Sequence, residues 1–308
     1  MKILFDSHTH INNDTYSEEE RAQLIADIEA SDVAYAMDIG FDLPSSERAA
    51  ADAARLPWCY AAVGVHPHDT KTMTEEIYEK IRRLAGQPKV QAIGEIGLDF
   101  YYNHSDAEDQ RYWFRRQIRL ANALRMPIVI HAREADQETM DILKEEGAFS
   151  DERCSWFPLR PGTGIGRKTG AGITQKAGHA GEGGRAEASD CTENCCMEKD
   201  ARVLLHCFSG SRELAAQYVK LGATISIAGP VTYKNNRKTS EVVNAIPIEY
   251  LLVETDAPYL TPEPYRGKKN KSPYVEYTAR RVALLKGMAY EEVARRTLEN
   301  AKRFYEIE

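Results

Sequence analysis

Short runs of apolar, β-branched residues alternate along the chain with longer segments in which apolar residues recur at helical spacing. The short runs predict strands at Ile3–Ser7, Val33–Ile39, Cys59–Val65, Val90–Ile96, Ile128–His131, Val203–His206, Thr224–Ile227 and Tyr250–Glu254. The longer segments predict helices at Glu18–Ala30, Pro44–Ala54, Glu75–Leu84, Ala107–Leu124, Asp136–Glu145, Arg212–Lys220, Val275–Leu285 and Tyr290–Tyr305. This alternation is typical of a parallel sheet wrapped by helices. It predicts an α/β protein with a closed (β/α)₈ TIM barrel, and a doubly wound open sheet is the alternative.

One segment, residues 148–200, interrupts this alternation. Apolar periodicity is lost there, and nine glycines lie between Gly162 and Gly184. Such a composition buries too little apolar surface to offset the entropy of ordering, so we expect a flexible, low-complexity insertion within a single domain, residues 1–308. The insertion connects a helix to a strand, and such loops lie on the face of a barrel opposite the active site. We therefore predict that it does not contact substrate.

Composition limits the classes of function. The 308 residues carry a net charge of −7, which argues against a general nucleic-acid coat protein. It does not argue against a nuclease, because bound metal ions add positive charge to the site. Polar residues appear too early for a signal peptide, and no apolar run would span a membrane, so we expect a cytoplasmic protein. The cluster Cys191, Cys195 and Cys196 is expected to be free thiols, with a structural zinc site as the alternative.

Histidines and carboxylates recur where the predicted strands end. A pair two residues apart on a strand shares one side, and a lone carboxylate within an apolar strand requires a partner. Catalytic residues of barrel enzymes come from such strand ends. Together these donors exceed what one ion takes from a protein, so we predict two divalent ions, Mg, Mn or Zn, bridged by Glu95. The predicted ligands are His8, His10, Glu95, His131, His206 and Asp256.

A series of motifs resembles the TatD family of deoxyribonucleases. In chain order they are residues 5–10 (FDSHTH), 64–68 (GVHPH), 94–100 (GEIGLDF), 130–133 (IHAR), 205–210 (LHCFSG), 254–260 (ETDAPYL) and 266–270 (RGKKN). The resemblance implies a TIM-barrel metallohydrolase of the 3′-5′ exonuclease type that cleaves DNA phosphodiester bonds with a metal-activated water. It also implies that one ion is held by His8, His10, Glu95 and Asp256, and the second by Glu95, His131 and His206.

Further roles are expected for residues near these ligands. Asp256 is the predicted base that deprotonates the attacking water, beside the bridging Glu95. His66 is the third predicted catalytic residue, hydrogen-bonding the phosphate or the leaving group, and a loop-packing role is its alternative. Arg133 is expected to contact phosphate, with a surface ion pair as the alternative. The other predicted substrate-binding residues follow the last strand and are Arg266, Lys268 and Asn270.

Two other functions fit the same residues. A barrel with this metal site could hydrolyse an amide, an ester or a non-nucleic-acid phosphoester, because fold does not fix substrate. A protein of a different class, which binds metal and a partner without catalysis, is the second alternative. The basic residues after the last strand and Arg133 favour a phosphate-containing substrate, and hence DNA.

Overall fold

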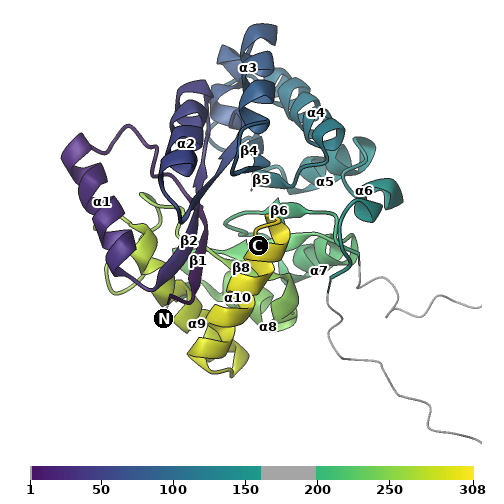
Figure 1. Ribbon diagram of the computed structural model, residues 1–308. Coiled ribbons are helices and arrows are strands. Elements are labelled where there is room, and N and C mark those ends of the chain that lie inside the picture. Colours follow the sequence, from purple (N-terminus) through teal and green to yellow (C-terminus); the bar gives the residue numbers. More distant parts are fainter. Residues whose placement is uncertain (1, 161–198) are drawn as a thin grey trace, which may run out of the picture.

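In a computed structural model of the protein, eight parallel strands follow one another in sequence order around a barrel (Figure 1). The structure describes residues 2–160 and 199–308. The strands are β1 (Leu4–Thr9), β2 (Val33–Ile39), β3 (Cys59–Val63), β4 (Val90–Asp99), β5 (Ile128–Arg133), β6 (Val203–Leu205), β7 (Thr224–Ile227) and β8 (Leu251–Val253). Helices connect them on the outside, so the predicted (β/α)₈ barrel is confirmed.

The helices cover the outer surface of the barrel. They are α1 (Glu18–Ala30), α2 (Leu43–Arg55), α3 (Glu75–Ala85), α4 (Ala107–Leu124), α5 (Asp136–Glu145), α6 (Asp151–Ser155), α7 (Arg212–Lys220), α8 (Arg237–Ala245), α9 (Val275–Lys286) and α10 (Tyr290–Phe304). Short 3₁₀ turns are η1 (Pro67–Thr72), η3 (Gly229–Thr232), η4 (Ile248–Tyr250) and η5 (Ser272–Tyr274). Within the described residues, no helix is long and apolar enough to cross a membrane.

Helix α8 was not predicted, because its apolar face is short. Only Thr239, Val242 and Val243 are buried along it. Its start is nevertheless fixed by a side chain: Asn236 accepts a hydrogen bond from the backbone N–H of Thr239 at 3.1 Å. Such a cap satisfies a donor that the first turn would otherwise leave unpaired, and it requires no apolar residue.

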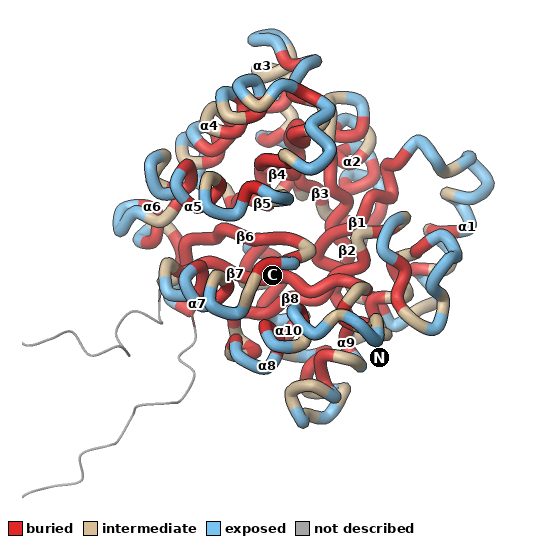
Figure 2. The backbone as a smooth tube through the Cα atoms, turned by 180° about the vertical axis from the view of Figure 1, so that it is seen from behind, coloured by how far each residue is buried: buried red, intermediate tan, exposed pale blue. Residues whose placement is uncertain are grey.

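The barrel interior is filled by one apolar cluster that includes Phe5, Met37, Val129 and Leu252. Side chains alternate between the interior and the helices along each strand, so most strand residues are buried, as Figure 2 shows. The cluster is completed from outside the sheet by Phe304, Tyr305 and Ile307, at and just after the end of α10. The Tyr305 hydroxyl donates to the Ser7 carbonyl at 2.9 Å. Residues at the end of α10 therefore close the barrel at the end opposite the carboxyl ends of the strands.

Both ends of the predicted insertion pack on the barrel. Arg153 on α6 is fully buried and donates to the carbonyls of Ala201 (2.8 Å) and Met126 (2.8 Å). Arg160 donates to the Glu249 carbonyl at 2.8 Å and to Asp200 at 3.2 Å. These partners precede β5, β6 and β8. Both ends of the insertion therefore lie on the face of the barrel where the strands begin, which is the face predicted for it. Buried guanidinium groups thus attach the two ends of the predicted segment 148–200 to the barrel.

The remainder of the predicted insertion, residues 161–198, lies outside the described residues. The expectations for Cys191, Cys195 and Cys196 fall there too. In the described part, Cys59 and Cys154 are buried free thiols, and Cys207 is a partly buried one. The expected state of the cysteine cluster therefore stays a prediction.

Candidate metal centre

The barrel closes between β1 and β8 at the edge where the predicted ligands lie. Thr9 and Ala257 form a parallel bridge there. The backbone N–H of His10 donates to the Ala257 carbonyl at 2.8 Å, and that of Asp256 donates to the His8 carbonyl at 2.9 Å. This seam brings the two histidines of the first strand beside a carboxylate from the far end of the sequence.

A first set of donor atoms converges at this seam. His8 Nε2 lies 3.3 Å from His10 Nε2 and 3.7 Å from Asp256 Oδ1, and His10 Nε2 lies 3.4 Å from that oxygen. Glu95 Oε2 is 3.3 Å from His8 Nε2 and 3.8 Å from His10 Nε2. Ligand atoms roughly 2.0–2.2 Å from a tetrahedral ion stand about 3.3–3.6 Å apart. The observed separations of 3.3–3.8 Å are close to this range, so His8, His10 and Asp256 could hold one divalent ion, with Glu95 beside them.

A second set of donors faces the other oxygen of the same carboxylate. Glu95 Oε1 lies 2.7 Å from His206 Nε2 and 2.9 Å from His131 Nδ1. These two nitrogens are 3.4 Å apart. Glu95 lies within β4, whereas His206 follows β6 and His131 lies on β5. One buried carboxylate therefore stands between two groups of imidazoles, with one oxygen facing each.

The outer nitrogens of His10 and His131 have hydrogen-bond partners that orient the rings. His10 Nδ1 donates to the Ile39 carbonyl at 2.8 Å. A carbonyl only accepts, so Nδ1 carries a proton, and Nε2 faces the centre, where it would bind an ion once its own proton is lost. His131 Nε2 lies 3.1 Å from Asp99 Oδ2, and His206 Nδ1 lies 3.5 Å from Glu254 Oε1. In each of these rings the other nitrogen faces the centre.

Asp99 and Glu254 extend the site beyond the six predicted ligands. Asp99 lies at the end of β4 and also contacts His68 Nε2 at 2.9 Å. Glu254 accepts hydrogen bonds from the Cys207 backbone N–H at 2.7 Å and from Ser226 Oγ. Asp99 was not among the predicted ligands, although it shares period-two spacing with Glu95 on one strand.

Both inward-facing carboxylates are ionised in this arrangement. Burial alone would raise the pKa of Glu95, but the charge of His206 and hydrogen bonds from the histidines lower that pKa well below its usual value. Burial likewise opposes ionisation of Asp256, yet the hydrogen bond from His10 lowers its pKa. Two anionic carboxylates among imidazoles form a donor set that suits a divalent cation.

His66 lies against the second donor set. Its Nδ1 accepts a hydrogen bond from the His68 backbone N–H at 3.1 Å, and its Nε2 lies 3.5 Å from Glu95 Oε1. Burial and the nearby His131 lower the pKa of His66 well below its usual value, so the ring is neutral. Since Nδ1 accepts, the single ring proton is on Nε2. His66 therefore presents a hydrogen-bond donor to the centre rather than a lone pair.

Arg133 lies at the end of β5, on the same edge of the barrel. Its guanidinium group stacks on the rings of Tyr101 at 4.1 Å and Tyr102 at 4.5 Å. Both tyrosines are about half exposed. Stacking leaves the N–H edges of a guanidinium group available for hydrogen bonds.

The predicted substrate-binding residues after β8 divide into two groups. Arg266 and Lys268 are exposed, and Arg266 lies 4.5 Å over the ring of Tyr233. Asn270 is buried, and its amide donates to the carbonyls of Thr255 at 2.9 Å and Tyr259 at 2.6 Å. A substrate contact was predicted for Asn270, but its donors are occupied by backbone carbonyls. The structure places it as a support for the loop that carries Asp256.

Known proteins share both the sequence and the fold of this chain. The sequence model of the family described as TatD related DNase matches residues 5–154 and 179–306. YabD of Bacillus subtilis, named as an uncharacterized metal-dependent hydrolase, is 37% identical over 305 residues, 99% of this chain and 100% of that protein. A protein of Salmonella typhimurium named 3′-5′ ssDNA/RNA exonuclease TatD is 29% identical, covering 99% of each chain.

A solved structure agrees with these sequence matches. The crystal structure of YJJV, a TatD homolog from Escherichia coli K12, superposes with a TM-score of 0.76 at 22% identity, over 100% of this chain and 99% of that one. Residues 155–178, which the family model leaves unmatched, fall within the predicted insertion. The resemblance inferred from the motifs is confirmed: the chain belongs to the TatD-related family of metal-dependent hydrolases.

Proposed function

We propose that this protein is a two-metal deoxyribonuclease that removes nucleotides from DNA in the 3′-5′ direction. The observation that carries the proposal is the position of Glu95, whose two oxygens face two separate sets of donors. The Salmonella relative named as a 3′-5′ ssDNA/RNA exonuclease supports the substrate class. Mg, Mn or Zn would each be compatible with these imidazole and carboxylate ligands.

Each residue has a step in the proposed reaction. Two bound ions would lower the pKa of a water molecule and offset the charge of the phosphate. Asp256, ionised and at the mouth of the barrel, accepts the proton of the attacking water. His66 donates its Nε2–H to the phosphate or to the leaving oxygen. Arg133, held on two tyrosine rings, contacts the neighbouring phosphate.

The proposal is tested by removing the metal and restoring it. Protein stripped with a chelator should not cleave 3′-labelled single-stranded DNA, and Mg, Mn or Zn should restore cleavage. Glu95→Ala should bind fewer ions per chain and show no restored cleavage, because each donor set loses one oxygen of the shared carboxylate. The control is Glu108→Ala, which removes an exposed carboxylate on α4. Wild-type protein that holds two ions but cleaves no DNA would indicate another ester or amide substrate.

Asp99 offers a separate prediction on metal affinity. Asp99→Asn should weaken binding of the ion beside His131 about 10–100-fold, because the neutral amide supports the ring less well than a carboxylate. Competition with a chromogenic chelator measures this affinity. Asp109→Asn, an exposed change on α4, should leave it unaltered. A metal affinity of the Asp99 variant equal to that of the wild type would mean that His131 is oriented by its other contacts.

A further inference from the structure

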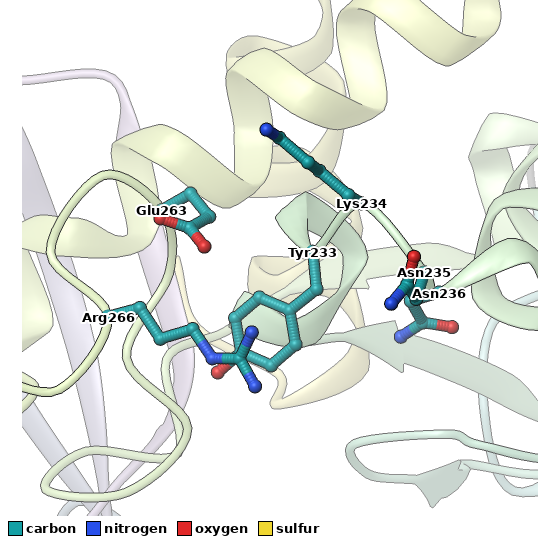
Figure 3. A pocket seen from close by; sticks show the side chains of 6 residues that line it. All are labelled: Tyr233, Lys234, Asn235, Asn236, Glu263 and Arg266. Carbon is teal, nitrogen blue, oxygen red and sulfur yellow. The ribbon is translucent and has the colours of Figure 1, made fainter.

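A pocket of about 570 Å³ lies on the same face of the barrel as the metal centre. One wall is the segment between η3 and α8, and the other is the loop that follows β8. Since both segments follow the carboxyl ends of strands, the pocket opens on the face that holds the ligands. Its lining residues, shown in Figure 3, are Tyr233, Lys234, Asn235, Asn236, Glu263 and Arg266.

The two walls are fixed to each other by close packing. A Cβ atom on Gly229 would lie 2.2 Å from the Leu260 carbonyl oxygen, so only glycine allows this approach. The Tyr233 hydroxyl donates to the Thr261 carbonyl at 2.9 Å. The Glu263 backbone N–H donates to Thr232 Oγ1 at 2.9 Å. The pocket is therefore formed before any ligand arrives, which lowers the entropy lost on binding.

Positive charge gathers around this pocket in a chain that is acidic overall. Lys234 and Arg266 line it, and the exposed Arg237, Lys238 and Lys268 lie next to them in the sequence. Among the described residues that line the pocket, Glu263 alone carries a carboxylate. Because the chain as a whole carries −7, this concentration of cations marks the pocket as a place for an anion.

Neighbouring lysines on the same loop are engaged elsewhere. Lys269 pairs with Glu20 at 3.1 Å, and Lys271 pairs with Asp27 at 2.7 Å. By contrast, the Arg266 guanidinium group lies over the Tyr233 ring, with Asn235 and Asn236 across the pocket from it (Figure 3). That arrangement leaves the N–H edges of the guanidinium group available to a phosphate.

We propose that this pocket binds a phosphodiester unit of single-stranded nucleic acid at a distance from the bond that is cleaved. The inference rests on the proposed function and extends it to a second point of attachment for the strand. A volume of about 570 Å³ exceeds the needs of a free phosphate and suits a nucleotide unit. Lys234 and Arg266 bind the phosphate, while the exposed amide of Asn235 and the carboxylate of Glu263 face the base or sugar.

Equilibrium binding tests the proposal without catalysis. A fluorescein-labelled single-stranded DNA is titrated with protein in chelator, over a series of salt concentrations. For the double variant Lys234→Ala/Arg266→Ala, the slope of log K against log salt should fall by about 0.7 for each phosphate that the variant no longer neutralises. The matched control is Lys144→Ala/Lys220→Ala, which removes two exposed lysines at the ends of α5 and α7. Its slope should equal that of the wild type.

Kinetics with two substrates separate the pocket from the metal centre. For the metal-loaded double variant, KM for a long oligonucleotide should rise about tenfold with kcat unchanged. Hydrolysis of bis(p-nitrophenyl) phosphate, which offers a single phosphodiester group and no neighbouring nucleotide for the pocket, should be unaltered. Unchanged slope and KM would overturn the proposal, as would an equal loss on both substrates. Wild-type protein that binds no DNA would instead contradict the proposed function itself.

Discussion

Replacing Asp256 by asparagine is expected to lower kcat by about 10²–10⁴-fold while the barrel stays folded. The carboxylate lies 3.4 Å from His10 Nε2 and is ionised, whereas an amide neither accepts a proton nor binds a cation as strongly. Asp256 has a φ of 55°, in the left-handed region that asparagine also adopts readily. The substitution should therefore change the chemistry of the site and leave its backbone in place.

This effect is measured as kcat on single-stranded DNA at saturating metal, together with the thermal unfolding temperature. Asp141→Asn, an exposed substitution on α5, serves as the control and should change neither quantity. A variant of Asp256 that retains kcat within tenfold would show that another group takes the proton. A large fall in the unfolding temperature would instead show that Asp256 holds the seam between β1 and β8.

Replacing Arg153 by alanine is expected to reduce the free energy of unfolding by about 3–5 kcal/mol. The guanidinium group is fully buried and donates to the carbonyls of Ala201 and Met126 and to Asn122 Oδ1. Without it, these acceptors lose their donors in a region closed to water. The segments that lead into β5 and β6 would also lose the group that holds them to α6.

Urea unfolding followed by circular dichroism measures this change. Arg83→Ala, an exposed substitution on α3, should alter the free energy of unfolding by less than about 0.5 kcal/mol. Because Arg153 lies at the end of the barrel opposite the metal centre, kcat of the folded variant should remain unchanged. A free energy within about 1 kcal/mol of wild type would mean that water replaces the missing donors.

Much of the fold follows from the sequence, because the strands are short, apolar and separated by amphipathic segments. The predicted boundaries of the strands were less accurate than their positions in the chain. Residues up to Val65 were assigned to β3, which ends at Val63, and β4 continues past Ile96 to Asp99. Hydrogen bonding across the sheet decides where a strand ends, and a single chain segment does not carry that information.

The six predicted ligands come together because each follows an apolar run that the barrel aligns on one edge. Roles that a residue performs through a contact with another residue were harder to predict from the sequence. Asp99 acts through His131, and Asn270 holds a loop through two carbonyls. Such roles depend on contacts between distant segments, so residue type and spacing did not mark Asp99 as a site residue and assigned Asn270 to substrate binding rather than to support of a loop. The pocket beside Arg266 likewise exists only where two loops meet.

The closing of the barrel by residues beyond its last strand has a consequence for biosynthesis. Phe5 on β1 leaves the ribosome early, yet its ring stacks against that of Tyr305, with centroids 6.0 Å apart. The interior cluster is complete only when Phe304, Tyr305 and Ile307 have been synthesised. Until then one end of the barrel stays open and apolar strand residues are exposed, a state that molecular chaperones recognise. Folding of the barrel is thus expected to finish only after the residues up to Ile307 have left the ribosome.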